Sequence, residues 1–315
     1  HPARLGGPDV QGMVDWFAIE RVAGREVDVG MHRHLIDPTE PFARLVLRPA
    51  HGALITSATL RDKAPASPAP ADAEDADWQR AEVRAGAQHL ALPPRRLAIA
   101  SPFDYAAQTR LYVVTDVDKR DTGQIAAAYR ALFLAAHGGA LGLFTAIARL
   151  RAVHARLAAP LFAAGLPLYA QHVDPIDTGS LIDMFRAEEN ACLLGTDAVR
   201  DGIDVPGRSL RLIVFDRLPW PRPSLLHRAR REAFGGRAYD DLITRLRLTQ
   251  AFGRLVRRRS DRGVFAILDA AAPSRLFSGL PDGVAIERVG LAEAVRRTVA
   301  FLAPVPVLAS GGAAQ

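Results

Sequence analysis

The chain has 315 residues, a formal net charge of +6 and a 49% share of hydrophobic residues, so it can build one large or two modest domains with a sizeable core. Its single cysteine, Cys192, excludes intrachain disulfides and any metal site made of four cysteines. No apolar run reaches the roughly 18–20 residues that a membrane span needs, and no signal-peptide pattern is present, so we expect no membrane association.

Before residue 105 the sequence predicts only short secondary-structure elements. We expect residues 51–60 to form a strand with a polar carboxyl end, and residues 64–76, which are rich in Ala, Pro, Asp and Ser, to form a mobile loop. The other expected elements of this part are an extended piece, two helices and a crossing segment, at 15–19, 41–47, 78–88 and 97–105.

From residue 111 onward, strand patterns and helix patterns alternate. The expected strands are 111–114, 141–145, 166–170, 191–195, 210–215 and 264–268. The expected helices are 122–136, 146–163, 176–186, 223–234, 239–257 and 291–302. This alternation predicts an α/β fold, a parallel sheet with helices on both faces. Ligand sites in such folds lie at the carboxyl ends of the strands.

Positive charge is concentrated in one part of the chain. Residues 208–262 contain 15 arginines against 5 acidic residues. A concentrated basic field suits the phosphates of ATP or of a nucleic-acid backbone, with binding that weakens as salt rises. The alternative is a solvated surface of a protein that is rich in arginine.

The helix expected at 239–257 carries a polar flank. At about 100° per residue, Gln250, Arg254 and Arg257 fall on one side at i, i+4 and i+7. Guanidinium groups stay charged and offer a planar fork of donors, which suits a polyphosphate. A solvated helix face is the alternative interpretation.

The spacing Gln-x-x-Gly-Arg-x-x-Arg at 250–257 resembles the last conserved motif of superfamily 2 helicases. Further segments are similar to motifs of the DinG and XPD helicases, in the same order along the chain. They are the Ser-Ala-Thr motif at 57–59, motif V at 195–207, and the signatures Ser101–Tyr105, Leu143–Thr145 and Phe215–Pro219. The chain departs from the family at Arg200 and Asp201, where an aromatic and a Glu are usual, and at 145–147, where Thr-Ser-Tyr is usual.

The resemblance implies a domain organisation. Residues 106–305 would be the RecA-like second motor lobe of an ATP-dependent DNA helicase, and residues 306–315 a disordered tail. Residues 1–105 would come from an accessory, arch-like region and the end of the first motor lobe. The resemblance also implies 5′→3′ movement on single-stranded DNA, a role in DNA repair, and a bacterial, cytoplasmic protein that acts at the nucleoid.

The resemblance assigns nucleotide contacts to five residues. Arg257 matches the arginine finger, Arg254 a second phosphate contact, and Gln250 a contact to the γ-phosphate or its attacking water. Gly202 would permit a tight backbone turn. Asp204 would orient the ribose, the water or the finger, and its alternative role is to cap the following loop.

Four further residues receive roles in coupling and in DNA binding. Ser57 and Thr59 match the positions that transmit nucleotide state to the DNA track. Thr145 and the neighbouring amides, at the expected start of a helix, are placed to bind a phosphate of the single strand. Thr196 in motif V is expected to do the same.

A phosphate-binding loop needs Gly-Lys-Ser/Thr, but the only lysines are Lys63 and Lys119, and neither follows a glycine. We also find no acidic box for a metal. We therefore expect an amino-terminal motor lobe to hold most of the ATP and its Mg²⁺, and the chain, which starts at His1, to be the carboxy-terminal part of a longer protein that is inactive alone. We expect no metal site, because His32 and His34 have metal-like spacing but no third ligand nearby.

Two alternatives stay open at this stage. The first alternative is a catalytically silent RecA-like module that binds single-stranded nucleic acid or a partner protein. A nuclease or nucleotide-modifying enzyme is disfavoured, because no acidic metal cluster is evident in the sequence.

Overall fold

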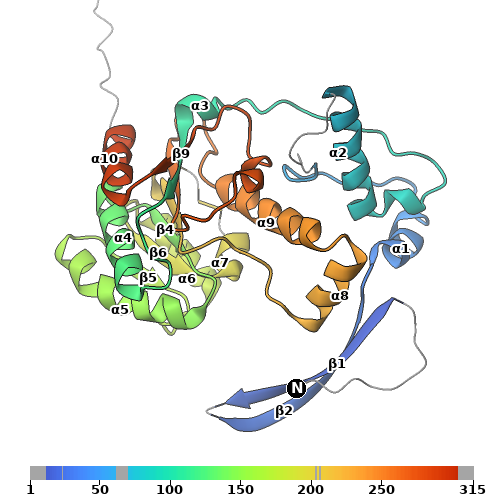
Figure 1. Cartoon of the computed structure of the whole chain (residues 1–315), viewed down its shortest axis with the longest axis horizontal. Helices are drawn as coiled ribbons and strands as arrows, with labels where there is room; N and C mark the ends of the chain where they lie inside the picture. Colours follow the sequence, from blue (N-terminus) through green and yellow to red (C-terminus); the bar gives the residue numbers. More distant parts are fainter. Residues whose placement is uncertain (1–11, 23, 62–69, 203, 206, 304–315) are drawn as a thin grey trace, which may run out of the picture. The chain divides into compact units, whose positions relative to one another are not determined.

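The computed structural model describes residues 12–22, 24–61, 70–202, 204–205 and 207–303, which fall into two compact units. Unit 1 draws on His1–Ala100, Trp220–Thr249 and Ser274–Gly279, and unit 2 on Ser101–Pro219, Gln250–Pro273 and Leu280–Gln315. Figure 1 labels their helices and strands. The tail expected at 306–315 lies outside the described residues.

Unit 2 is built on a seven-stranded parallel sheet in the order β5-β6-β4-β7-β8-β3-β9. The strands are β3 (Thr109–Val114), β4 (Ala140–Leu143), β5 (Leu168–Ala170), β6 (Cys192–Gly195), β7 (Leu212–Phe215), β8 (Gly263–Ile267) and β9 (Ile286–Val289). Four inner strands, β4, β6, β7 and β8, are buried along their whole length, as expected for a sheet covered on both faces. The predicted RecA-like α/β fold is confirmed, and Cys192 is buried in β6.

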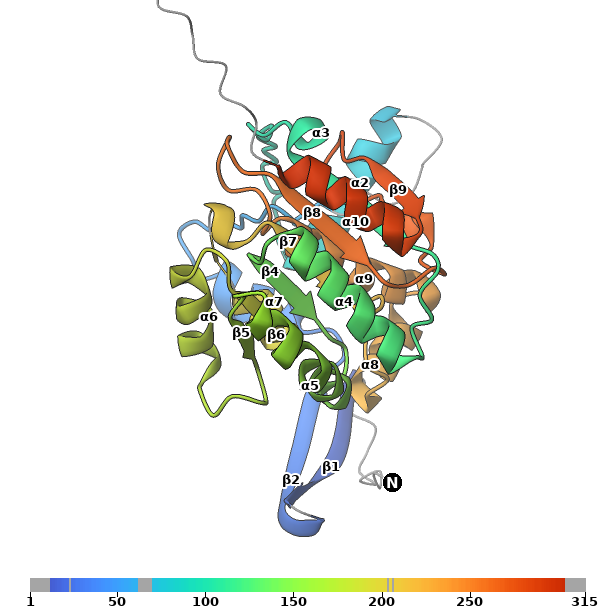
Figure 2. The same ribbon diagram turned by 90° about the vertical axis from the view of Figure 1, so that its left-hand side faces the viewer.

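Three helices cover one face of this sheet, as Figure 2 shows: α4 (Thr122–Ala135), α5 (Ile147–Ala163) and α10 (Leu291–Leu302). Their buried side chains and those of the strands beneath them form one hydrophobic cluster. The remaining helices of unit 2 are α3 (Tyr105–Gln108), α6 (Thr178–Ala187) and α7 (Asp197–Gly202).

Tyr129 of α4 ties two strands together inside that cluster. Its ring stacks on Phe144 with a centroid distance of 4.8 Å. Its buried hydroxyl donates to the carbonyls of Leu143 and Val214, each at 3.1 Å. The hydroxyl of Tyr129 is thus paired inside the core, and it bridges the backbones of β4 and β7.

Strand β9 and helix α9 differ from the predictions. Strand β9 was not predicted, because its four residues alternate between exposed and half-buried positions at the sheet edge. The helix predicted at 239–257 is α9 (Arg237–Phe252), which ends five residues early. Past Phe252 the amides of Arg254 and Leu255 donate to carbonyls three residues back, which breaks the helical pattern. The amides of Arg257 and Arg258 then donate to the side chain of Asp261, at 2.8 Å each.

Unit 1 contains an antiparallel hairpin of β1 (Met13–Val22) and β2 (Arg25–Leu35). Its helices are α1 (Thr39–Phe42), the π-helical turn Ala43–Leu47, α2 (Pro70–Ala85), the 3-10 turns Ala87–His89 and Ser274–Phe277, and α8 (Leu225–Ala233), together with most of α9. The extended piece at 15–19 and the helix near 41–47 are thus confirmed. His32 and His34 stack on Trp16 at 5.1 and 4.8 Å, so they belong to a ring cluster of the hairpin.

Two predictions for this unit are wrong. Residues 51–60 form no strand, because within the described part of the chain no other strand pairs with them. Residues 70–76 of the predicted loop 64–76 belong to α2, whose run of Ala, Asp and Glu favours a helix. Residues 64–69 lie outside the described residues.

At the amino edge of the sheet, a buried arginine closes the turn between α4 and β4. Arg211, 6% exposed, donates to four backbone carbonyls and one side-chain amide, those of Ala136, His137, Arg208, Glu189 and Asn190. Gly138 allows the turn, since its φ is +78° and a Cβ would lie 1.9 Å from a carbonyl oxygen. Burial lowers the pKa of Arg211, but the five acceptors compensate the charge.

We predict that Arg211→Leu lowers the free energy of unfolding by about 2–4 kcal/mol, because it leaves several buried carbonyls without a donor. Arg208→Ala is the control. Its side chain is 68% exposed and pairs with Glu189 at the surface, so its loss should cost within about 1 kcal/mol. Urea unfolding of both variants measures the difference, and equal small losses would contradict this role for Arg211.

Candidate nucleotide and nucleic-acid site

Four strands of unit 2 are followed within two residues by a polar side chain at the same edge of the sheet. Thr145 follows β4, Thr196 follows β6, Asp216 follows β7 and Asp269 follows β8. Parallel strands end at one edge, which is where ligands bind in such sheets. The structure therefore brings together two predicted DNA contacts, Thr145 and Thr196, and two carboxylates that were not predicted.

Thr145 lies directly before α5. Its amide donates to Oδ1 of Asp216 at 3.3 Å, and α5 begins two residues later, at Ile147. The positive end of a helix dipole and its free amides attract anions. Thr145 thus lies just before the amino end of a helix, and the phosphate contact expected there stays a prediction.

Thr196 is more strongly held by the protein itself. Its amide and its hydroxyl both donate to Oε1 of Gln171, at 2.9 and 2.8 Å, and it is 8% exposed. The side-chain amide nitrogen of Gln171 in turn donates to the hydroxyl of Thr178 at 3.1 Å. A phosphate at Thr196 would have to take over donors that Gln171 now uses.

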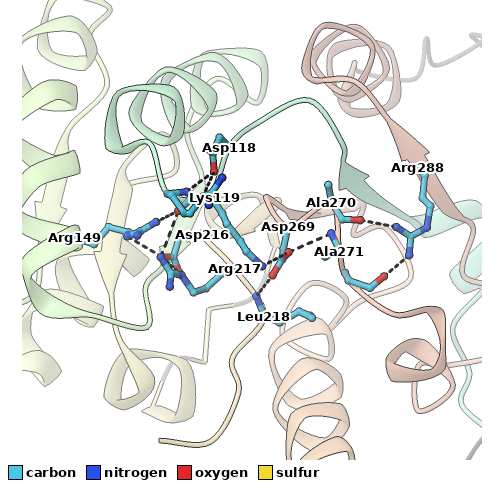
Figure 3. Close-up of polar contacts among 12 residues, drawn as sticks. Asp118, Lys119, Arg149, Asp216, Arg217, Leu218, Asp269, Ala270, Ala271 and Arg288 are labelled. Atoms are coloured by element: carbon cyan, nitrogen blue, oxygen red, sulfur yellow. Dashed lines mark hydrogen bonds and ion pairs between the residues drawn. The ribbon is translucent and has the colours of Figure 1, made fainter.

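A charged network lies at the ends of β7 and β8, drawn in Figure 3 and called the edge cluster here: Lys119, Arg149, Asp216, Arg217 and Asp269. Nε of Arg217 lies 3.4 Å and Nε of Arg149 3.6 Å from Oδ2 of Asp216. Nζ of Lys119 lies 2.7 Å from Oδ1 of Asp269. The carbonyl of Lys119 accepts from both arginines, so one backbone group links the cluster.

The carboxylate of Asp216 is fully buried. Burial raises the pKa of Asp216 to about 6, although Arg217 and Arg149 act in the opposite direction. Its Oδ2 accepts no hydrogen bond within the described residues, so the two ion pairs are loose ones. Three cations share two carboxylates, and the cluster therefore keeps a positive excess beside Thr145.

Sequence reasoning missed this cluster. The segment Phe215–Pro219 attracted attention as a signature, but Asp216 and Arg217 received no role. Lys119 and Arg149 stand 98 and 68 positions before Arg217 in sequence, and only the fold brings them together. A signal was present: Asp216 follows a fully apolar run, and a charge in that position needs partners.

The candidate finger, Arg257, lies on a loop and not on a helix. Gln250 is exposed near the end of α9, and Arg254 follows in a turn, so the expected flank at i, i+4 and i+7 is wrong beyond Phe252. Nη2 of Arg257 lies 3.3 Å from Oδ1 of Asp204. The fold thus pairs two predicted site residues that are far apart in sequence.

Asp204 follows the short helix of motif V. Gly202 is the last residue of α7, and the carbonyl of Asp204 accepts from Nε of Arg186 at 3.1 Å. Arg200, which replaces the usual aromatic, is 5% exposed and pairs with Asp197 at 2.8 Å. The side chain of Asp204 is 69% exposed, so it is accessible to a ligand as well as to Arg257.

The two predicted coupling residues lie in unit 1. The hydroxyls of Ser57 and Thr59 are 3.1 Å apart, and Oγ of Ser57 accepts from the amide of Thr59 at 3.1 Å. They form a local turn at the surface instead of the strand end that we expected.

Within the described ranges, no three His, Cys, Asp or Glu side chains gather closely enough to hold a metal ion. The same part of the chain contains no helix that is both long and apolar enough to span a membrane.

The buried Asp216 makes stability depend on pH in a specific direction. Its pKa rises from 3.8 to about 6 on folding, so its neutral form is favoured in the native state, and its contribution to stability is lost as pH rises from about 4 through 6. Relative to the unchanged chain, Asp216→Asn should therefore gain on the order of 3 kcal/mol of unfolding free energy between pH 4 and 7.

Urea unfolding at several pH values measures this gain. Asp118→Asn is the matched control, because hydrogen bonds from Arg120 lower the pKa of the exposed Asp118, and that variant should show no rise over the same range. A constant difference between Asp216→Asn and the unchanged chain would contradict the buried, poorly paired carboxylate.

Several known proteins are similar to this chain in sequence. Residues 130–277 match the helicase C-terminal domain family. The ATP-dependent helicase DinG of Mycobacterium tuberculosis H37Rv is 36% identical over 190 residues, which cover 56% of this chain and 28% of that protein. The 3′-5′ exonuclease DinG of Bacillus subtilis is 29% identical over 280 residues, covering 83% and 28%. The chain thus spans 28% of the length of these relatives.

A third relative is the ATP-dependent DNA helicase YoaA of Escherichia coli, 32% identical over 184 residues, which cover 55% of this chain and 28% of that protein. Among solved structures, an XPD helicase aligns with a TM-score of 0.42 and 17% identity, over 57% of this chain and 35% of that one. Residues 130–277 thus match a helicase carboxy-terminal domain family, and the chain is similar in sequence to the DinG-type ATP-dependent helicases.

Proposed function

We propose that the chain supplies the carboxy-terminal motor lobe of an ATP-dependent DNA helicase, residues 106–305, together with the end of the first lobe within residues 1–105. The observation that carries this proposal is the 3.3 Å contact between Arg257 and Asp204. It joins the helicase motif at 250–257 to motif V at one place on unit 2. In this reading Arg257 is the arginine finger, and it acts on a nucleotide held mainly by another lobe.

The chemistry of phosphoryl transfer to water explains why an arginine is needed there. Charge builds on the oxygens of the γ-phosphoryl group, and a guanidinium placed against them stabilises the transition state. Arg257 rests against Asp204, and both side chains are partly exposed. Nucleotide would replace that carboxylate as its partner. Arg254, Gln250 and the turn at Gly202 would complete the nucleotide contacts.

The single strand of DNA would follow the carboxyl edge of the sheet. Thr145 offers the amides at the start of α5, and Thr196 offers donors that Gln171 now holds. The positive excess of the edge cluster lies on the same edge. These groups contact a backbone and read no bases, so the track would be insensitive to sequence.

The proposed partner within the same protein is an amino-terminal motor lobe that holds ATP and Mg²⁺. Unit 1 supports this, because it exposes large apolar side chains to an unusual degree, with Leu54, Leu97 and Ile99 at 88, 78 and 84%. Ser57 and Thr59 would then report nucleotide state from that lobe. We further propose that the protein works in DNA repair at the bacterial nucleoid, in the cytoplasm, with 5′→3′ polarity.

In the two-lobed protein, Arg257→Ala should lower DNA-stimulated ATP turnover by roughly 10³-fold or more, because it removes the transition-state contact. Arg257→Lys should restore little, since an ammonium cannot copy the guanidinium fork. Affinity for single-stranded DNA without nucleotide should be unchanged. Steady-state phosphate release with single-stranded DNA present measures the effect.

Arg259→Ala is the matched control, since this exposed side chain lies on the same loop two residues away. It should keep turnover within about twofold of the unchanged protein. Equal losses at 257 and 259 would refute the finger assignment. Unchanged turnover in Arg257→Ala would favour the alternative of a catalytically silent module that binds single strands or a partner.

The chain alone should bind single-stranded DNA weakly, because it offers only part of the track. For two or three phosphate contacts, the affinity should fall roughly tenfold between about 50 and 200 mM salt, with little preference among mixed and uniform sequences. Fluorescence titration with labelled oligonucleotides checks this. Salt-insensitive binding, or a strong preference for one sequence, would point to a recognition module instead.

A further inference from the structure

The loop that carries Arg257 is held by two buried side chains from different parts of unit 2. Residues 253–262 connect α9 to β8 without regular structure. Gln108 and Asp261 are each 6% exposed, and the side chains of both form hydrogen bonds with the backbone of this loop. Neither belongs to the helicase motif at 250–257.

Gln108 bonds to this loop although it lies 150 positions before Arg258 in the sequence. Its amide nitrogen donates to the carbonyls of Arg258, Arg259 and Asp261, at 3.0, 3.2 and 2.9 Å. An amide has two hydrogens, so three carbonyls can share them only if the loop curls around this one nitrogen. The next residue, Thr109, pairs with Gly263 in β3 and β8, and this pairing fixes where the amide stands.

Asp261 holds the other side of the curl. Its Oδ2 accepts from the amides of Arg257 and Arg258, at 2.8 Å each. Its own amide donates to the carbonyl of Arg258 at 3.1 Å. Charge-assisted bonds of this length are strong. The backbone at Arg257 and Arg258 is therefore fixed through both its donors and its acceptors.

We propose that Gln108 and Asp261 are positioning residues for Arg257. Together they fix the loop backbone from which the guanidinium of Arg257 reaches the carboxylate of Asp204. This rests on the proposed role of Arg257 as the finger. Neither residue touches that guanidinium, so they act through the loop. A finger on a long side chain needs a rigid base, because transition-state stabilisation depends on donors that are held in place beforehand.

Hydrogen–deuterium exchange on the chain itself tests the clamp without any activity assay. Gln108→Met keeps the side-chain length and removes the donor, so amide exchange in residues 257–261 should quicken roughly tenfold or more. Exchange in β8 should stay unchanged. The matched control is Gln124→Met, whose side chain bonds to Asp121 and the Asp118 amide at the surface, and which should leave the loop unaffected.

Asp261 gives a second route to the same result. Asp261→Ala removes the acceptor of both amides, whereas Asp261→Asn keeps a neutral oxygen in its place, so exchange should quicken more in the alanine variant than in the asparagine one. Unchanged exchange of the loop in Gln108→Met and in Asp261→Ala would overturn the clamp. Equal quickening over the whole of unit 2 would overturn it as well, since it would mean general destabilisation.

A double-mutant cycle in the two-lobed protein tests the link to Arg257. Gln108→Met should lower kcat roughly 10- to 100-fold with little change in KM for ATP, and should add nothing in the Arg257→Ala background. If Arg257→Ala leaves turnover intact, the proposed function fails. If Arg257→Ala lowers turnover to a small measurable residue while Gln108→Met costs the same factor in both backgrounds, only this inference fails.

Discussion

The parallel alignment of seven strands is the constraint on which the rest of unit 2 depends. Since every strand ends at the same edge, the residues that follow β4, β6, β7 and β8 meet there, although they are spread over more than a hundred positions of sequence. The sheet itself is apolar and buried. Polar groups at its edge must therefore find partners among themselves or in a ligand.

Two solutions to this constraint occur in the structure. At the amino edge, Arg211 gives its donors to backbone carbonyls, and its charge serves the fold. At the carboxyl edge, Asp216 keeps one oxygen without a hydrogen bond and has only loose ion pairs with Arg149 and Arg217. The same fold that gives the buried Arg211 all of its hydrogen-bond partners leaves the buried Asp216 with an incomplete set. Incomplete pairing of this kind is expected where a ligand binds.

The loop that carries Arg257 is also shaped by the sheet. The chain must leave α9 and enter β8 beside β3, and Leu255 packs so closely there that a Cβ at Gly263 would lie 2.8 Å from it. A helix that continued to residue 257 could not make this turn. The loop gives up its helical hydrogen bonds, and Gln108 and Asp261 replace them.

Much of this fold could be predicted from the sequence, because buried parallel strands are short apolar runs and their helices have caps. Asp121 and Asp177, for example, cap α4 and α6. The edge strand β9 and residues 51–60 were mispredicted, since both depend on which neighbour they pair with. A regular helical spacing concealed the end of α9 at Phe252, because the loop beyond it is held by the nearby carboxylate of Asp261 and by the side-chain amide donor of the distant Gln108.

The site was predictable only where a motif recorded it. The spacing at 250–257 and motif V together indicated Arg257 and Asp204, and the fold brings the two side chains within 3.3 Å. No local pattern marked Gln108 or Arg149, because Gln108 bonds to residues 150 to 153 positions away and Arg149 pairs with Asp216, 67 positions away. Such pairs follow from strand order and register, which the sequence of one segment does not contain.

The central claim is that this chain is one lobe of a two-lobed ATP-driven motor. The measurement that tests it most directly is phosphate release from ATP, with single-stranded DNA present, by the chain alone and by the chain joined to the ATP-binding lobe of a DinG-type helicase. The account predicts background turnover for the chain alone and DNA-stimulated turnover for the joined protein. Robust turnover by the pure chain would contradict it, and so would a joined protein that folds, binds ATP and single-stranded DNA, and hydrolyses nothing.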